Sequence, residues 1–276
     1  MLLIKCMESI EKNQMIKNSS LLGIKHLAES IALEFSEIIT PLDKILEEEE
    51  LDLFYDSYGD NFDGMTIYDN SQFFIHVNIV KGNRPNTPRS RFTIAHELGH
   101  YFIDNHRIGL KIGLLTPHPS KNNENTHFKI EREADYFASC LLMPEERFKK
   151  YIQRKKFEFS MIKSLSEHFQ TSITATAIRF ADIGNHPLMI VFGGNGEIKW
   201  KWSSDDFPFK YLLYNDIIPE NSVMGEYFQK ARLPKNTEDV WPIDWFNYVK
   251  DYDVHRKFKE HCIAHKHLAL SIIWEV

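Results

Sequence analysis

The sequence has few cysteines, no long apolar run and no excess of positive charge, and each absence excludes a class of protein. Its 276 residues include only three cysteines, Cys6, Cys140 and Cys262, which lie far apart and form no CxxC pair. An odd number at such wide spacing does not support a disulfide framework. The sequence therefore predicts a protein of a reducing compartment.

No stretch has the length and hydrophobicity of a membrane span or a secretory signal. A bilayer is crossed by roughly 18 or more consecutive apolar residues, and the chain contains no such run. The N-terminus, MLLIKCMESI, reaches a lysine too early to supply the apolar core of a signal peptide. We therefore expect a cytoplasmic protein with no membrane partner.

The charge balance argues against a general nucleic-acid binder. The formal net charge is −6, whereas proteins that bind polyanions through their whole surface are usually basic. The helix-turn-helix-like segment 160–181 carries only Lys163 and Arg179 as fixed positive charges. Direct DNA binding is therefore not expected, because so few cations neutralise little phosphate charge.

Hydrophobic spacing divides the chain into a mainly helical part with a few strands and a mixed C-terminal part. Helical periodicity covers residues 20–39, and a short helix should follow, with Thr40 as its N-cap and Pro41 in its first position. Further segments are expected as strands at 51–58, 64–69 and 72–79, a loop at 81–90, and helices at 91–106, 128–142 and 145–183, the last with a break near 170–172.

The character of the chain changes near residue 186. LMIVFGGNGEIKWKW is typical of a strand pair around a Gly-Gly-Asn-Gly turn, and the C-terminal LALSIIWEV is strand-like. We therefore predict two domains, 1–185 and 186–276, with an α+β fold overall.

The stretch RFTIAHELGHYF contains the pattern HExxH, at His96, Glu97 and His100. Residues four apart lie on one face of a helix, so the two imidazoles can bind one ion, and the carboxylate between them can act as a base. The pattern is expected by chance in roughly 0.05 of chains of this composition. An amphipathic helix with exposed histidines is the alternative reading.

The surrounding residues favour a buried helix and a metal site. The apolar face comprises Phe92, Ala95, Leu98, Phe102 and Ile103. Gly99 costs helix stability, about 1 kcal/mol relative to alanine, which is explained if another backbone or a substrate approaches closely there.

A catalytic zinc usually has three protein ligands and one open position, so a third ligand is required. His106 occupies the spacing of a third histidine, but the glycine that such a turn needs is replaced by Ile103, which favours a continuous helix. His106 is then interpreted as a residue at the helix end. The other source is a glutamate near 131–133.

The segment KIEREADYFASCLLMP selects Glu131 over Glu133. On a helical wheel Glu131 shares a face with Asp135 and with small alanines, whereas Glu133 lies opposite, on the side of Cys140. Glu131 is therefore predicted to bind the metal, and Asp135 to accept a hydrogen bond from a ligating histidine. An exposed helix carboxylate is the alternative for Glu131.

RFTIAHELGHYF followed by EREADYFASCLLMP resembles the ImmA/IrrE family of metallopeptidases, over roughly residues 20–183. The resemblance implies a zincin-like, mostly helical peptidase core with a small sheet, followed by a smaller mixed accessory domain. It implies metal ligands His96, His100 and Glu131 and the base Glu97. It also implies a zinc-dependent endopeptidase that cleaves a regulatory protein, a helix-turn-helix repressor, through a metal-activated water.

Other readings stay open at this stage. Mn²⁺ or Fe²⁺ would also suit a His/His/Glu site, and the protein could instead be a non-cleaving sensor, anti-repressor or toxin–antitoxin partner. His118, His127 and Tyr136 are candidates for stabilising an oxyanion. HCIAH at 261–265 repeats the histidine spacing without a glutamate. The five tryptophans, all beyond residue 199, either fill a core or line a ligand pocket.

Overall fold

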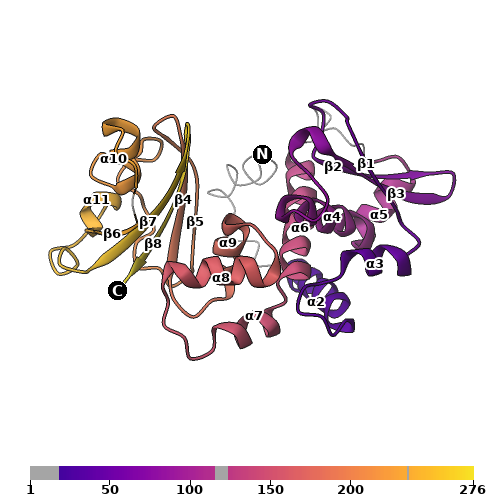
Figure 1. The fold of residues 1–276 in the computed structure, drawn as a ribbon, viewed down its shortest axis with the longest axis horizontal. Helices are drawn as coiled ribbons and strands as arrows, with labels where there is room; N and C mark the ends of the chain where they lie inside the picture. Colours follow the sequence, from indigo (N-terminus) through magenta and orange to yellow (C-terminus); the bar gives the residue numbers. More distant parts are fainter. Residues whose placement is uncertain (1–18, 116–123, 235) are drawn as a thin grey trace. The chain divides into compact units, whose positions relative to one another are not determined.

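The computed structural model describes residues 19–115, 124–234 and 236–276, and these have the predicted α+β fold (Figure 1). The chain forms two compact units. The first unit comprises Met1–Tyr151 with Leu165–Ser172, and the second comprises Ile152–Ser164 with Ile173–Val276. The domain boundary after residue 185 stays a prediction. None of the helices in the described ranges has the length and apolar character needed to cross a bilayer.

The chain enters the first unit through two helices, α2 (Ser19–Glu34) and α3 (Leu42–Glu48). The predicted first helix is therefore shorter than expected. The predicted cap of the second helix is wrong: Pro41 is the N-cap, and no side chain caps this helix. The reason is that the Thr40 hydroxyl donates to the Leu141 carbonyl oxygen at 2.7 Å, which fastens this corner to a distant helix.

A three-stranded sheet follows, with β1 (Asp52–Asp56), β2 (Gly64–Asp69) and β3 (Gln72–Asn78), as predicted. The spatial order is β1-β3-β2, with β1 parallel and β2 antiparallel to β3. Asn70 and Ser71 both have positive φ, which is the geometry of a two-residue hairpin turn that matches the twist of the strands. A short 3-10 helix, η2 (Ile79–Lys81), ends the sheet.

Three helices carry the predicted motifs: α4 (Pro88–Phe102), α5 (Asp104–Lys111) and α6 (Glu124–Leu142). α4 begins earlier than predicted, because Thr87 is its N-cap and Pro88 occupies its first turn. The buried face of α4 packs against both α6 and the sheet (Figure 1). This packing places the histidine motif in the middle of the first unit.

The helical region after α6 contains three pieces, α7 (Glu145–Ile152), α8 (Phe159–Phe169) and α9 (Ile173–Ile183). The break near 170–172 is confirmed, and a second break separates α7 from α8. Arg179 is fully buried. One of the two cations that could have served DNA binding therefore cannot reach a phosphate.

The second unit is built on an antiparallel sheet of five strands in the order β5-β4-β8-β7-β6. The predicted hairpin at Asn195-Gly196 and the C-terminal strand are both present. The elements of this sheet and the helices beside it are β4 (Leu188–Gly194), β5 (Glu197–Ser203), α10 (Val223–Lys230), β6 (Thr237–Val240), α11 (Pro242–Trp245), β7 (Phe258–His265) and β8 (Leu268–Glu275).

The tryptophans mostly fill the core of the second unit. Trp200, Trp245 and Trp274 are at most 5% exposed, whereas Trp241 is 50% exposed. The Trp245 indole N–H donates to the buried carboxylate of Glu260 at 2.7 Å. Core packing therefore accounts for most of these aromatics without a ligand pocket.

Candidate metal centre

His96 and His100 lie one turn apart on α4, as the motif spacing predicts, and their imidazoles meet on the same face. Their Nε2 atoms are 3.1 Å apart. His96 is buried and the His100 side chain is 12% exposed. Two ring nitrogens this close need a shared proton or cation between them, because lone pairs directed at each other repel.

Glu131 on α6 brings a carboxylate to the same point. Its oxygens lie 3.2 Å from His96 Nε2 and 3.6 Å from His100 Nε2. Among the residues described here, these three side chains are the group of His, Cys, Asp or Glu whose ligand atoms converge tightly enough for one ion. The separations of 3.1–3.6 Å suit a tetrahedral ion, since zinc bonds of about 2.0–2.1 Å imply ligand atoms about 3.3 Å apart.

The close approach of α4 and α6 depends on Gly99. A Cβ atom at this position would lie 3.1 Å from the Ala134 Cα and 3.2 Å from a Phe137 ring carbon. Ala134 is itself fully buried and has a small side chain. The expectation that Gly99 admits another backbone therefore fits the structure, and the small residues hold Glu131 within reach of the histidines.

Replacing Gly99 with alanine should push α4 and α6 apart. We expect the free energy of unfolding to fall by about 1–3 kcal/mol, despite the better helix propensity of alanine, because the methyl group overpacks the helix interface. Zinc affinity should fall as well. Denaturant unfolding and competitive zinc titration measure the two effects. Gly23→Ala on α2 is the matched control, since nothing lies within 4 Å of a Cβ there, and equal behaviour of both variants would contradict the prediction.

Asp135 orients the first histidine. His96 Nδ1 lies 2.8 Å from Asp135 Oδ1, and because a carboxylate only accepts, Nδ1–H is the donor, which leaves Nε2 as the ring nitrogen directed at Glu131. Burial alone would lower the pKa of His96, but its hydrogen bonds with Asp135 and Glu131 hold that pKa well above the usual value. The arrangement attracts a cation.

Glu97 lies beside this group, on the side facing the sheet. It is only 4% exposed, and the Thr66 hydroxyl on β2 lies 2.8 Å from its Oε2 and 3.0 Å from its carbonyl oxygen. A Cβ at Gly64 would lie 2.8 Å from Glu97 Oε1, so the strand leaves room only for glycine there. Burial raises the pKa of Glu97 to about 7, against the partly compensating charge of His96 and the Thr66 hydrogen bond.

The raised pKa of Glu97 predicts how the metal-free protein responds to pH. The folded state holds the proton more tightly than the unfolded chain, where the pKa is about 4.5. The stability from this proton is therefore fully present below pH 4.5 and is lost as pH rises through about 7. The free energy of unfolding of metal-free Glu97→Gln, taken relative to that of the wild type, should therefore rise by up to about 3 kcal/mol from acidic to alkaline pH. Urea unfolding with a chelator measures this, and a difference independent of pH would contradict it.

His106 does not lie where it was predicted. Ile103 has extended backbone and ends α4, so His106 falls in the first turn of α5 and not at the C-terminal end of a continuous helix. It is 1% exposed, and its Nε2 lies 3.0 Å from a Glu133 oxygen. His106 and Glu133, the two unselected third-ligand candidates, thus pair with each other.

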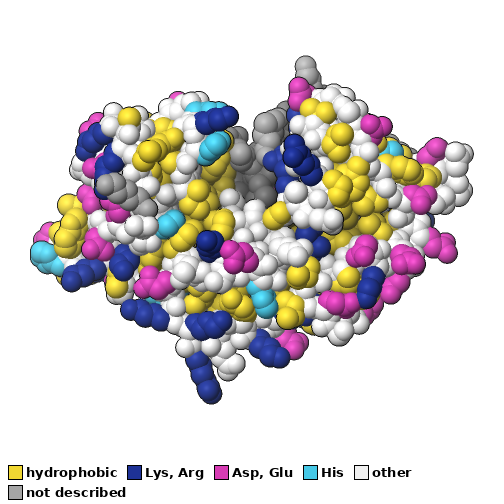
Figure 2. Space-filling view, in the orientation of Figure 1, with side chains coloured by type: hydrophobic (Ala, Val, Ile, Leu, Met, Phe, Trp, Pro, Cys, Tyr) yellow, Lys and Arg dark blue, Asp and Glu magenta, His cyan; other side chains and the backbone are white. Residues whose placement is uncertain are grey.

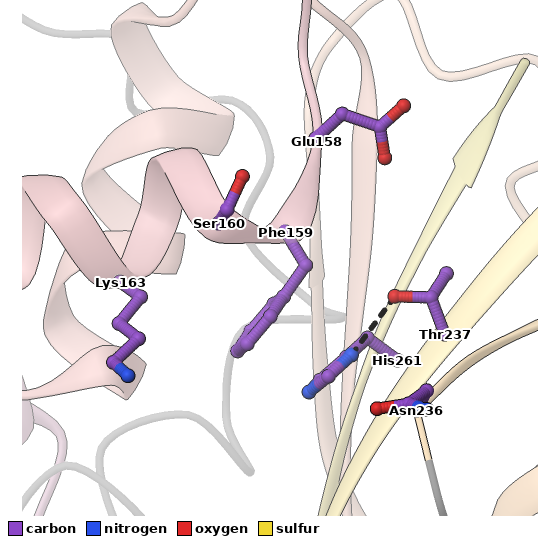
Figure 3. Close-up of a pocket in the computed structure, with 7 residues that line it drawn as sticks. All are labelled: Glu158, Phe159, Ser160, Lys163, Asn236, Thr237 and His261. Atoms are coloured by element: carbon purple, nitrogen blue, oxygen red, sulfur yellow. Dashed lines mark hydrogen bonds between the residues drawn. The ribbon is translucent and has the colours of Figure 1, made fainter.

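The second histidine pair, in HCIAH, lies on strand β7. Four residues along a strand span about 13 Å, so His261 and His265 are too far apart for one ion. His261 instead forms a hydrogen bond with Thr237 at 3.0 Å and stacks on the Phe159 ring (Figure 3). The four-residue spacing has its metal-binding meaning only on a helix.

Of the three oxyanion candidates, Tyr136 is the one whose side chain lies among the described residues. His118 lies outside the described residues, as does the side chain of His127. Tyr136 is half-buried on α6. The contribution that sequence reasoning missed is Thr66. Alternation along GMTIYD places this residue on the inner face of its strand, and a polar residue there signals a hydrogen-bonding partner beneath the sheet.

Part of the chain is similar to a known peptidase family. Residues 61–181 match the peptidase family model described as the IrrE N-terminal-like domain. A Mycobacterium tuberculosis transcriptional regulator of known structure is similar in fold, with a TM-score of 0.62 and 14% identity, over 100% of this chain and 82% of that one. No curated protein matches the sequence. At 14% identity, this likeness shows a shared fold.

Proposed function

We propose that the protein is a zinc-dependent endopeptidase of the ImmA/IrrE type, because residues 61–181 match the family model described as the IrrE N-terminal-like domain. The observation that carries the proposal is the convergence of His96, His100 and Glu131, with Glu97 buried beside them. Two histidines and one carboxylate are a donor set of catalytic zinc sites, which keep a fourth position open. Mn²⁺ or Fe²⁺ would fit the same donors.

Each of these side chains has a distinct task in the proposed hydrolysis. His96, His100 and Glu131 would hold the ion, and Asp135 would keep the His96 Nε2 lone pair directed at it. A bound zinc supplies Lewis acidity that polarises a peptide carbonyl and lowers the pKa of water from 15.7 to about 7. Glu97 accepts a proton from the attacking water at a carboxylate oxygen and then donates it to the leaving amine. Thr66 fixes the rotamer of Glu97.

The substrate we propose is a helix-turn-helix transcriptional repressor. The ImmA/IrrE resemblance implies this class, and the similar fold of a protein titled as a transcriptional regulator is consistent with a role in gene control.

The test combines metal analysis with a search for cleavage products. Purified full-length protein should contain about one zinc per chain, and 1,10-phenanthroline should remove the zinc and any proteolysis together. In cells, new protein N-termini that appear with the wild type and not with Glu97→Gln should map to a helix-turn-helix repressor. A protein that fails to bind any divalent ion in zinc-supplemented buffer would overturn the peptidase proposal. Reproducible products from unrelated proteins would overturn only the substrate class.

A further inference from the structure

The outer face of the three-stranded sheet carries a compact apolar patch. Strand register places Phe54, His76 and Met65 side by side in one row, and Phe74 and Ile67 in the next. We call these five side chains the outer patch. They alternate with the inward residues that pack toward α4, so they point away from the core of the first unit.

The side chains of the outer patch pack against one another and remain partly exposed to solvent. Phe54 is 45% exposed, and the other four side chains are partly exposed. Phe54 stacks on His76 at 5.3 Å between ring centroids and lies 6.2 Å from Phe74. The Tyr58 hydroxyl lies 2.6 Å from His76 Nδ1, which fixes the imidazole against the row. Ordered aromatic side chains of this kind are typical of protein recognition surfaces.

Acidic residues surround the outer patch. Residues 41–80 contain ten Asp or Glu and one Lys, so this segment carries more negative charge than the whole chain of net −6. Asp52, Asp56 and Asp69 are exposed and point to the same side of the sheet as the patch. Figure 2 shows acidic side chains gathered over the part of the molecule that carries α3 and β1–β3. An apolar centre with an acidic rim selects its partner by charge.

The strand that borders the patch also borders the metal centre. On β2, Met65 and Ile67 face outward, while Thr66 between them faces inward and bonds to Glu97. A helix docked on the outer patch would therefore lie on the opposite face of the sheet from Glu97, with β2 between them.

We propose that the outer patch is the docking surface for a basic amphipathic helix of a protein partner. The apolar stripe of such a helix would cover Phe54, Phe74 and Ile67, and its lysines and arginines would lie against Asp52, Asp56 and Asp69. Nucleic acid is repelled by the acidic rim. A second copy of the chain would place two acidic rims against each other, which like-charge repulsion disfavours. The inference goes beyond the proposed peptidase function and does not depend on it.

The test is a binding titration with the full-length protein. The probe is a fluorescein-labelled amphipathic helical peptide of about 16 residues, about 24 Å long, with leucines on one face and lysines beside them. We expect saturable binding by fluorescence anisotropy that weakens between about 0.1 M and 1 M salt, where the Debye length falls from about 10 Å to 3 Å. The same peptide with glutamate in place of each lysine should not bind.

Variants separate this surface from general electrostatics. Asp52→Asn, Asp56→Asn and Asp69→Asn combined should weaken binding about tenfold, as the loss of three exposed ion pairs implies. The control combines Asp216→Asn, Asp239→Asn and Asp251→Asn, which removes the same charge from other exposed positions and should leave affinity within about twofold. Phe54→Gln should also weaken binding, and Ile243→Gln, at a site 51% exposed, should not.

Three outcomes would overturn the proposal. The first is absence of saturable binding by the wild type, with circular dichroism confirming a folded protein. The second is equal weakening by the rim variant and its control, which would assign the binding to net charge alone. The third is concentration-dependent dimerisation in sedimentation that Phe54→Gln abolishes, which would assign the outer patch to a second copy of this chain.

Discussion

Replacing Glu97 with glutamine should reduce peptide cleavage by about 10²–10⁴-fold, the usual contribution of a general base, while zinc binding persists. Glu97 is not one of the three converging ligands, so the ion keeps its protein donors. Glutamine preserves the volume of the side chain and can still accept the hydrogen bond from Thr66, now 2.8 Å from the carboxylate. What it removes is the ability to take a proton.

The measurement is kcat/KM on an identified substrate, with the zinc content of each variant determined on the same preparation. Glu49→Gln is the matched control, because this carboxylate also accepts a side-chain hydrogen bond, from Tyr101 at 2.9 Å, and is not one of the converging ligands. It should retain near wild-type cleavage. Activity of Glu97→Gln within tenfold of wild type would remove Glu97 from the chemistry. Lost zinc in that variant would instead assign it a role in metal binding.

The parts of the candidate site that the sequence predicted are those set by helix geometry. His96 and His100 are one turn apart on any helix, and the wheel of the second motif selects Glu131 because small alanines occupy the same face. The structure brings these three side chains within bonding distance of one ion. Such arguments succeed because both angular position and the size of neighbouring residues are local properties of the chain.

Two similar Thr-Pro pairs show where local reasoning stops. Thr87-Pro88 caps α4, whereas Thr40-Pro41 begins α3 without a side-chain cap, because the Thr40 hydroxyl bonds to Leu141. The competing partner lies 101 residues away in the sequence. The local sequence therefore indicates which hydrogen bonds a side chain is able to form, and tertiary contacts determine which of them it does form.

The predicted end of α4 is wrong for a related reason. No glycine directly follows Ile103, and for that reason a continuous helix was predicted. The structure breaks the helix there, and this change buries His106 against Glu133. The signal in the sequence is Asp104-Asn105, because both residue types favour turns and helix starts. The gain in burying Ile103, at 8% exposure, and His106 outweighs the helical propensity of a single residue.

Replacing Glu131 with glutamine should weaken zinc binding by about 10²–10³-fold. Protein zinc sites bind with apparent free energies of about 10–16 kcal/mol, and the share of one ligand out of four is about 3–4 kcal/mol. Glutamine keeps the shape of the side chain but removes the charge that draws the ion toward His96 and His100, whose Nε2 atoms lie 3.2 and 3.6 Å from its oxygens. Cleavage should disappear at zinc concentrations that saturate the wild type.

Glu133→Gln is the matched control, two residues away on the same helix. Glu133 is paired with His106 and Lys129, so it is a half-buried carboxylate comparable to Glu131. Burial raises the pKa of Glu133, but the hydrogen bond with His106 and the charge of Lys129 lower it by more. Its amide variant should keep zinc affinity within about twofold, because it is outside the three converging ligands. Competitive titration with a chromophoric chelator gives both constants. If Glu131→Gln binds zinc as tightly as Glu133→Gln, the third ligand lies elsewhere, and the convergence of α4 and α6 serves only to pack the first unit.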